Sequence, residues 1–229
     1  MHLSAFSSLC LGTLVVLGSP IVQRRDTDLN STRCPDFCAN TETTTDSDPA
    51  LYVCGDKRLG PVTLPSGIPL EGIAGMGSTY RRFGGLCPGE FLAKYWNTTS
   101  KWFDYPKHEG YSLDTAGEVA KFNLTLKRGD FIDRFGSENG TYVAPAGTPY
   151  ALRSLPPVNL NAKPEAKYPY NYYVYMVMRN MVVEGGPIAP WFGQQGLGIQ
   201  FLMPDHKQLW QLVEEGYLAR IDLKTDPYW

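Results

Sequence analysis

The sequence predicts an α+β protein in which β-structure dominates the C-terminal half and a small, disulfide-stapled lobe forms the N-terminal half. The cysteines beyond residue 25 all lie in the first half, which is also rich in turn residues. From about Glu118 onward, cysteine is absent and strand-like runs take over. The 229 residues are 43% hydrophobic and 13% aromatic, enough for one good core or a core domain with a small appendage.

Residues 1–18 have the pattern of a secretory signal peptide. Leu9–Leu17 is a nearly continuous apolar run that is too short for a bilayer span, which needs about 20 residues. The alternative, an N-terminal core helix, would need a polar face that this run lacks. Arg24-Arg25 offers a second, dibasic point, so further processing after Arg25 is also expected. The pattern predicts a secreted protein.

Four Asn-x-Ser/Thr sequons support secretion independently, because such sites are glycosylated on the surfaces of secreted proteins. None has proline at the middle position, and the predicted acceptors are Asn30, Asn97, Asn123 and Asn139.

Removal of the signal peptide leaves an even set of cysteines, which predicts two disulfides in an oxidising compartment. They are Cys34, Cys38, Cys54 and Cys87. Three pairings are possible, and the spacing does not choose between them. A zinc site at Cys34 and Cys38 is the weaker alternative, because companion histidines at ligand spacing are missing.

We expect the cysteine-bearing lobe to span residues 26–118 and the second domain residues 119–229. Within the lobe, Pro88–Trp96 predicts a helix, since proline suits its first position and apolar residues follow at helical spacing. In the second domain, strands are predicted at Lys121–Lys127, Gly129–Gly136 and Thr141–Ala144. Tyr170–Glu184 is apolar on both alternating faces, which predicts a central, doubly covered strand.

Two further elements have local signals. Glu138–Thr141 contains Asn-Gly between strand-like runs, which predicts a hairpin with a type I′ turn. His206–Glu215 has an apolar stripe, with Asp205 as the expected N-cap and Gly216 as the expected stop.

Charge excludes some partners. The formal net charge is −2, and the chain has no basic run. Nucleic acid and an anionic membrane surface are therefore not expected as main partners.

Three segments in the C-terminal half combine arginines, aromatics and amides with glycines and prolines. They are Asp133–Tyr142, Tyr150–Pro157 and Pro190–Phe201. Arginine binds phosphate oxygens with a planar fork, and aromatic rings stack on bases. The combination predicts an anionic, aromatic, nucleotide-like ligand.

The motifs in these segments resemble the tuberculosis necrotizing toxin (TNT) domain family. They are Asp-Arg-Phe-Gly with a downstream Gly-Thr-Tyr, Arg-Ser-Leu-Pro-Pro, Ile-Ala-Pro-Trp-Phe-Gly-Gln and Gly-x-Gly-Ile-Gln-Phe, closed by Gly216-Tyr-Leu218. The resemblance covers residues 119–221, and the whole chain is similar to secreted fungal surface glycohydrolases of nicotinamide adenine dinucleotide (NAD). It implies a mainly β domain that hydrolyses NAD, or NADP, to nicotinamide and the ADP-ribose product. It also implies a location at the cell or spore surface and a homodimer.

The resemblance places the active-site positions on Arg134, Tyr142, Arg153 and Gln194. A histidine used by some bacterial relatives has no counterpart here, because His108 and His206 lie outside the corresponding interval. A calcium-binding tail of some fungal relatives is not expected either.

The chemistry of the residues agrees with this assignment. O-glycoside hydrolysis generally needs two carboxylates, whereas the pyridinium of NAD departs as neutral nicotinamide and needs no general acid. Arg134 and Arg153 are the expected pyrophosphate clamp. Gln194 is expected to orient the ribose or the attacking water, with Gln195 and Gln200 as alternatives.

Among the aromatic residues, Tyr142 and Phe135 are candidates for stacking on a base, whereas Trp191 and Phe192 are expected in the core or the site wall. We expect no cofactor and no metal, since no set of clustered ligands is visible.

Other enzyme classes fit poorly. Gly193–Gly198 lacks the Lys-Ser/Thr of a P-loop and the order of a dinucleotide-binding fold, so its glycines predict a tight bend. No Gly-x-Ser-x-Gly elbow of a serine hydrolase is present. The competing hypothesis is a non-catalytic, secreted NAD-binding or effector protein on the same scaffold.

Overall fold

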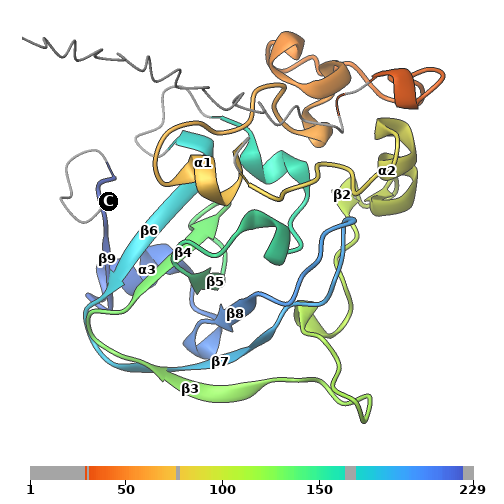
Figure 1. Cartoon of the computed structure of the whole chain (residues 1–229). Helices are drawn as coiled ribbons and strands as arrows, with labels where there is room; N and C mark the ends of the chain where they lie inside the picture. The colour runs from red at the N-terminus through yellow and green to blue at the C-terminus, as the bar shows by residue number, and fades with distance from the viewer. Residues whose placement is uncertain (1–28, 30, 76–77, 163–168, 224–229) are drawn as a thin grey trace, which may run out of the picture.

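The computed structural model describes residues 29, 31–75, 78–162 and 169–223 (Figure 1). Among these, the main sheet has seven strands in the order β3-β7-β8-β5-β4-β6-β9, and every neighbouring pair is antiparallel. The strands are β3 (Phe122–Leu126), β4 (Phe131–Phe135), β5 (Tyr142–Pro145), β6 (Tyr172–Val177), β7 (Met181–Pro187), β8 (Ile199–Leu202) and β9 (Leu218–Arg220). A two-stranded sheet of β1 (Trp96–Asn97) and β2 (Trp102–Phe103) lies in the N-terminal half. The predicted β-dominated α+β class is confirmed.

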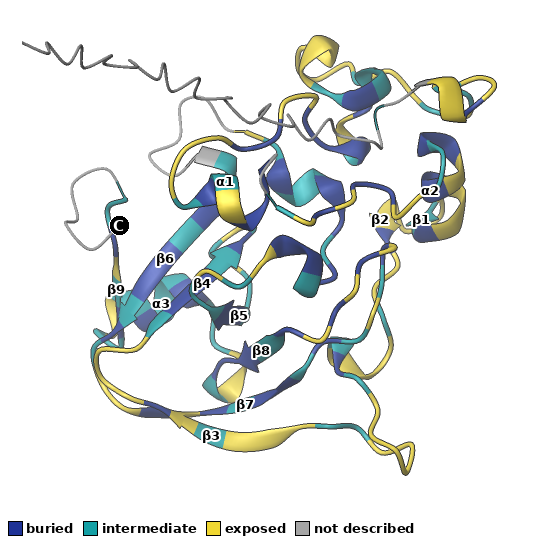
Figure 2. Cartoon of the chain, in the orientation of Figure 1, coloured by how far each residue is buried: buried dark blue, intermediate teal, exposed yellow. Residues whose placement is uncertain are grey.

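The predicted strand at Tyr170–Glu184 was right in burial and wrong in length. The run breaks at 178–180, where Arg179 and Asn180 are exposed and the Asn180 side chain accepts a hydrogen bond from the Arg128 amide at 2.9 Å. Its two halves, β6 and β7, pair with different neighbours. β6 is covered on both faces (Figure 2), because Tyr175 and Val177 join one core cluster while Tyr172 and Val174 join another.

The hairpin between β4 and β5 exists, but its turn is not type I′. Neither Asn139 nor Gly140 has a positive φ, and the connection runs over 136–141. The cause is Arg134, whose side chain folds beneath this loop and donates from Nε to the Ser137 carbonyl at 2.8 Å. A Cβ at Gly140 would lie 2.0 Å from the Arg134 guanidinium, so the glycine leaves the room in which this side chain lies.

Three α-helices lie among the described residues: α1 (Leu70–Ile73), α2 (Pro88–Tyr95) and α3 (Leu209–Glu214). None of them is long and apolar enough to cross a membrane. α2 confirms the predicted helix at Pro88 and ends one residue earlier than expected.

The C-terminal helix begins later than predicted. Asp205 has a φ of 51° and lies in a 3-10 turn, so it is not the N-cap. The N-cap is Gln208, whose backbone N–H donates to the Gln211 side-chain Oε1 at 2.9 Å. Gly216, with a φ of 72°, follows the helix as expected.

Two disulfides, Cys34–Cys87 and Cys38–Cys54, join the cysteines of the N-terminal half. The predicted framework is confirmed, its pairing is settled, and the alternative zinc site is wrong. Cys34–Cys87 ties the residue that follows the 3-10 turn Ser31–Arg33 to Cys87, the N-cap of α2.

The two halves of the chain share their cores. Phe192, from the C-terminal half, is fully buried among the rings of Phe91, Tyr95 and Phe103. Gly84 and Gly193 approach so closely that a Cβ on Gly84 would lie 2.4 Å from the Gly193 Cα. The expected boundary near residue 118 therefore separates stretches of sequence that share a core, and in Figure 1 the chain that follows β7 runs up to α2 and β2.

Three of the predicted glycosylation sites can be located. Asn123 and Asn139 are exposed, as a glycan requires, and Asn97 is half-buried. The Asn97 side chain accepts hydrogen bonds from the amides of Thr99 and Ser100 at 2.9 and 3.0 Å. Asn30 and the predicted signal peptide lie outside the described residues, and glycosylation stays a prediction.

The two disulfides should stabilise the fold unequally. Replacing Cys34 and Cys87 by alanine should lower the free energy of unfolding by about 4 kcal/mol, and replacing Cys38 and Cys54 by about 3 kcal/mol. The closed loops, with sequence separations of 53 and 16, restrict the unfolded chain to different extents. Urea unfolding of both double variants measures this, and a larger loss for the Cys38–Cys54 pair would contradict it.

Candidate active site

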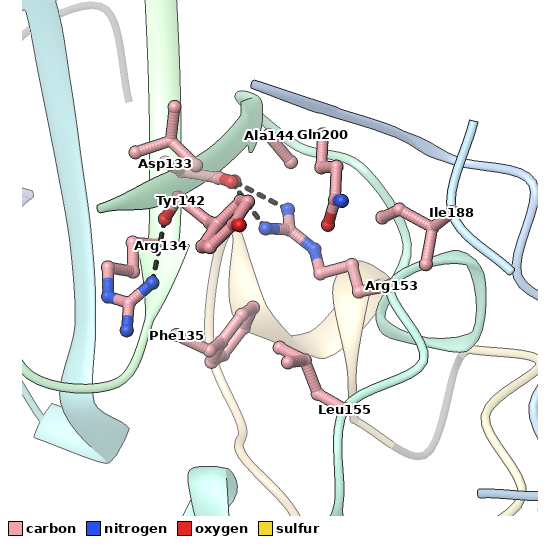
Figure 3. A pocket seen from close by; sticks show the side chains of 10 residues that line it. Asp133, Arg134, Phe135, Tyr142, Ala144, Arg153, Leu155, Ile188 and Gln200 are labelled. Carbon is pink, nitrogen blue, oxygen red and sulfur yellow. Dashed lines mark hydrogen bonds and ion pairs between the residues drawn. The ribbon is translucent and has the colours of Figure 1, made fainter. Parts of the chain in front are cut away.

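A cleft of about 350 Å³ opens between the ends of β4, β5 and β8 and a segment of the N-terminal half. It continues into a deeper recess of about 60 Å³. The two spaces share Arg134, Phe135, Tyr142, Arg153, Leu155, Ile188 and Gln200 (Figure 3). The structure thus brings together four residues that the sequence singled out, namely Arg134, Phe135, Tyr142 and Arg153.

Arg153 forms the floor of the recess through a buried ion pair with Asp133. Its Nη1 and Nη2 lie 2.5 and 2.8 Å from the two Asp133 carboxylate oxygens, and its Nε donates to the Thr148 carbonyl at 2.8 Å. The side chains are 4% and 0% exposed. The fork that we expected to hold phosphate is therefore occupied by a carboxylate. The interpretation of Arg153 as half of a pyrophosphate clamp does not fit this geometry.

Arg134 lies next to Asp133 on β4, and unlike Arg153 it has no carboxylate partner among the described residues. It donates from Nη1 to the Tyr142 carbonyl at 2.7 Å. Burial lowers the pKa of Arg134, because the charged form loses hydration. Arginine nevertheless stays protonated at neutral pH. An uncompensated cation lining a cleft favours an anionic ligand.

Gln194 and Gln200 differ in where their amides point. Gln194 is 5% exposed, does not line the cleft, and donates to the carbonyls of Arg81 and Phe192. Gln200 lines both the cleft and the recess. The expectation that Gln194 faces the ligand is corrected by this placement. Gln200, which lies in β8 and was one of the two alternatives, lines the cleft instead.

The Gln200 amide is oriented by the N-terminal half. Its Nε2 donates to the Glu109 carbonyl at 2.9 Å, and no described residue donates to its Oε1. His108, Glu109 and Gly110 have φ values of 56°, 57° and 83°, a left-handed turn that places this carbonyl. The carbonyl oxygen of the side chain is thereby left to face the cleft (Figure 3).

The two aromatic candidates line the cleft in different ways. Phe135 is 2% exposed, and its ring packs on Tyr150 and Tyr172 at centroid distances of 5.0 and 4.6 Å. Tyr142 is half-buried, and burial raises its pKa, so its hydroxyl stays protonated and can donate. Phe135 therefore serves mainly as a wall, whereas Tyr142 presents a surface for ligand contact. Phe192 is a core residue, one of the two outcomes we expected for it.

Sequence reasoning missed the cleft residues of the N-terminal half. They are Trp102, Tyr105, Pro106, Glu109 and Gly110. Glu109 and Gln200 are 91 positions apart, and no local pattern links them. The one available signal was Trp102 itself, a large apolar residue in a turn-rich stretch of the sequence.

Comparisons with known proteins agree with the sequence motifs. Residues 125–221 match the family model described as tuberculosis necrotizing toxin. The conidial surface nicotinamide adenine dinucleotide glycohydrolase of Aspergillus fumigatus is 47% identical over 205 residues, which cover 88% of this chain and 83% of that protein. A solved structure of tuberculosis necrotizing toxin with its immunity factor is 18% identical, covers 79% of this chain and 90% of that chain, and has a TM-score of 0.48. The chain belongs to the tuberculosis necrotizing toxin domain family that includes the fungal surface glycohydrolase.

Proposed function

We propose that this protein is a secreted NAD glycohydrolase, which cleaves the bond between nicotinamide and ribose. The observation that carries the proposal is the unpaired Arg134 in a cleft that also holds Tyr142 and the outward-facing amide of Gln200. The name of the Aspergillus fumigatus relative, which shares most of its length with this chain, supports it. NADP is an equally compatible substrate class.

The cleft suits a reaction whose leaving group needs no proton. Nicotinamide leaves the ribose as a neutral molecule, so the protein must hold the ribose, tolerate positive charge at the anomeric carbon and admit a water. The Gln200 Oε1 has no donor among the described residues, so it can accept from a ribose hydroxyl or from that water. An amide oxygen aimed at developing positive charge also stabilises it without forming a covalent bond.

Arg134 and Arg153 have different roles in the proposed reaction. Arg134 binds the pyrophosphate, because its charge has no competing carboxylate among the described residues. Arg153 acts as a positioning residue, since its ion pair with Asp133 fixes the floor against which Phe135 packs. The Arg153 guanidinium lies 5.2 Å from the Phe135 ring centroid.

Location and assembly extend the proposal. The predicted signal peptide and the surface location named for the Aspergillus fumigatus relative support release to, or retention at, the cell surface. A homodimer is proposed from the family resemblance alone.

The first test is nicotinamide release from NAD before and after exhaustive treatment with EDTA. We expect turnover that EDTA leaves unchanged, because departure of neutral nicotinamide needs no Lewis acid. The described residues contain no cluster of three or more potential ligand side chains. A rate that only zinc or magnesium restores would refute metal-free turnover. NAD binding without nicotinamide release would instead support the non-catalytic alternative.

A second test separates the two glutamines. Gln200→Ala should lower kcat by about 10²–10³ with an unchanged melting temperature, because it removes an oriented dipole from the charged transition state. Gln194→Ala should lower the melting temperature while kcat stays within about threefold, because its amide serves buried carbonyls. Steady-state kinetics and thermal unfolding measure both. The reverse pattern would return the substrate contact to Gln194.

A third test separates the arginines. Arg134→Ala should weaken substrate binding by roughly ten- to a hundredfold, the effect of losing a charged hydrogen bond. It should lower the free energy of unfolding less than Arg153→Ala does, because it leaves the Ser137 and Tyr142 carbonyls without this donor but leaves no buried carboxylate unpaired. Arg153→Ala should cost about 3–5 kcal/mol of unfolding free energy, because it leaves Asp133 buried and unpaired. Urea unfolding and KM values for both variants decide this. A stable Arg153→Ala protein with a raised KM would restore Arg153 to the clamp.

A further inference from the structure

Trp102 is 64% exposed, although the neighbouring position in the same strand points into the core. Successive residues of a strand point to opposite sides, and in β2 the inward position belongs to Phe103, which is 5% exposed. The Trp102 indole therefore faces outward, where it lines the cleft together with Tyr105. A large exposed aromatic at the edge of a cleft indicates a contact surface.

The backbone beneath these two rings is held firmly. The Asp104 amide donates to the Tyr95 carbonyl at 2.9 Å, and the Trp191 indole donates to the Asp104 carbonyl at 2.6 Å. The Tyr105 ring stands edge-on against Phe192, with centroids 5.3 Å apart. The wall is therefore fixed before a ligand arrives, which lowers the entropy cost of binding.

Trp102 and Tyr105 line the outer cleft and not the recess. Gln200 lines both spaces, and so does Arg134. Tyr105 is 42% exposed, and a tyrosine hydroxyl is protonated at neutral pH. The charge of Arg134, the cation that we assign to phosphate, acts on this hydroxyl.

On the basis of the proposed function, we propose that Trp102 and Tyr105 form the subsite for the adenine base of the dinucleotide. A dinucleotide whose reacting ribose lies at Gln200 and whose pyrophosphate lies at Arg134 extends its second base toward the outer cleft. That part of the cleft offers a broad indole face and a phenol. Purine rings stack on such surfaces with a favourable free energy that every base can gain.

The subsite lies outside the stretch that matches the family model, residues 125–221. The N-terminal half would accordingly set affinity for the adenylate part of the substrate, while the sheet carries the reacting centre. The two roles can be measured separately, because nicotinamide mononucleotide carries the reacting half of NAD and ADP carries the adenosine with the diphosphate.

The test measures binding of ADP and of nicotinamide mononucleotide by calorimetry to the full secreted protein and its Trp102→Ala variant. We expect ADP affinity to fall by roughly five- to a hundredfold, the range for one base–aromatic stack, with nicotinamide mononucleotide affinity unchanged. Trp102→Phe should recover most of the loss. Phe122→Ala is the matched control, since Phe122 is an aromatic residue that is 54% exposed and lies on β3, away from the cleft.

Each other result of the binding measurement overturns the subsite. A loss confined to nicotinamide mononucleotide would place the reactive base at the wall. An equal loss for both nucleotides would indicate a structural role, and unchanged affinities, or a wild-type protein that does not bind ADP, would remove the subsite altogether. Because calorimetry needs no turnover, a protein that binds ADP through Trp102 but releases no nicotinamide from NAD would contradict the proposed activity and leave the subsite standing.

Discussion

The buried ion pair between Asp133 and Arg153 is the constraint on which the site depends. Asp133 is fully buried, and besides Arg153 it accepts hydrogen bonds from the Tyr172 hydroxyl at 2.8 Å and the Gly147 amide at 2.9 Å. These contacts join β4, β6 and the loop that carries Arg153. A pair of this kind often adds little net stability, because desolvation of both charges offsets their attraction. Its value here is geometric, since it fixes three chain segments around one carboxylate.

That arrangement also explains why the neighbouring arginine is left with its charge. Asp133 and Arg134 are successive strand residues, so their side chains leave the strand in different directions, as Figure 3 shows. The Asp133 carboxylate pairs with Arg153, whereas among the described residues Arg134 donates only to the backbone carbonyls of Ser137 and Tyr142. The space that a side chain at Gly140 would fill is occupied by this guanidinium. The strand thus neutralises one cation and keeps another available in the cleft.

Local sequence signals predicted most of the framework. Strand-like runs predicted β3, β4 and β5, proline predicted the start of α2, and the even cysteine count predicted both disulfides. The errors came where a distant side chain decided a local structure. The turn after β4 is shaped by Arg134 rather than by Asn-Gly, and the role of Arg153 depends on a carboxylate 20 positions earlier. Motif order identified the right segments, but the orientation of Gln194 and Gln200 depends on Arg81 and Glu109, which no periodicity connects to them.

The cleft has one wall in each half of the chain, and each half holds part of the other wall in place. Phe192 packs in the core of the cysteine-bearing half, and Trp191 donates to the carbonyl of Asp104, so the sheet's own loop holds the opposite wall in place. In return, the left-handed turn at Glu109 holds the Gln200 amide that faces the cleft. Each half therefore supplies a contact that positions a cleft residue of the other. The disulfides act on the same geometry from a distance, because Cys34–Cys87 fixes the start of α2, whose Phe91 and Tyr95 pack against Phe192.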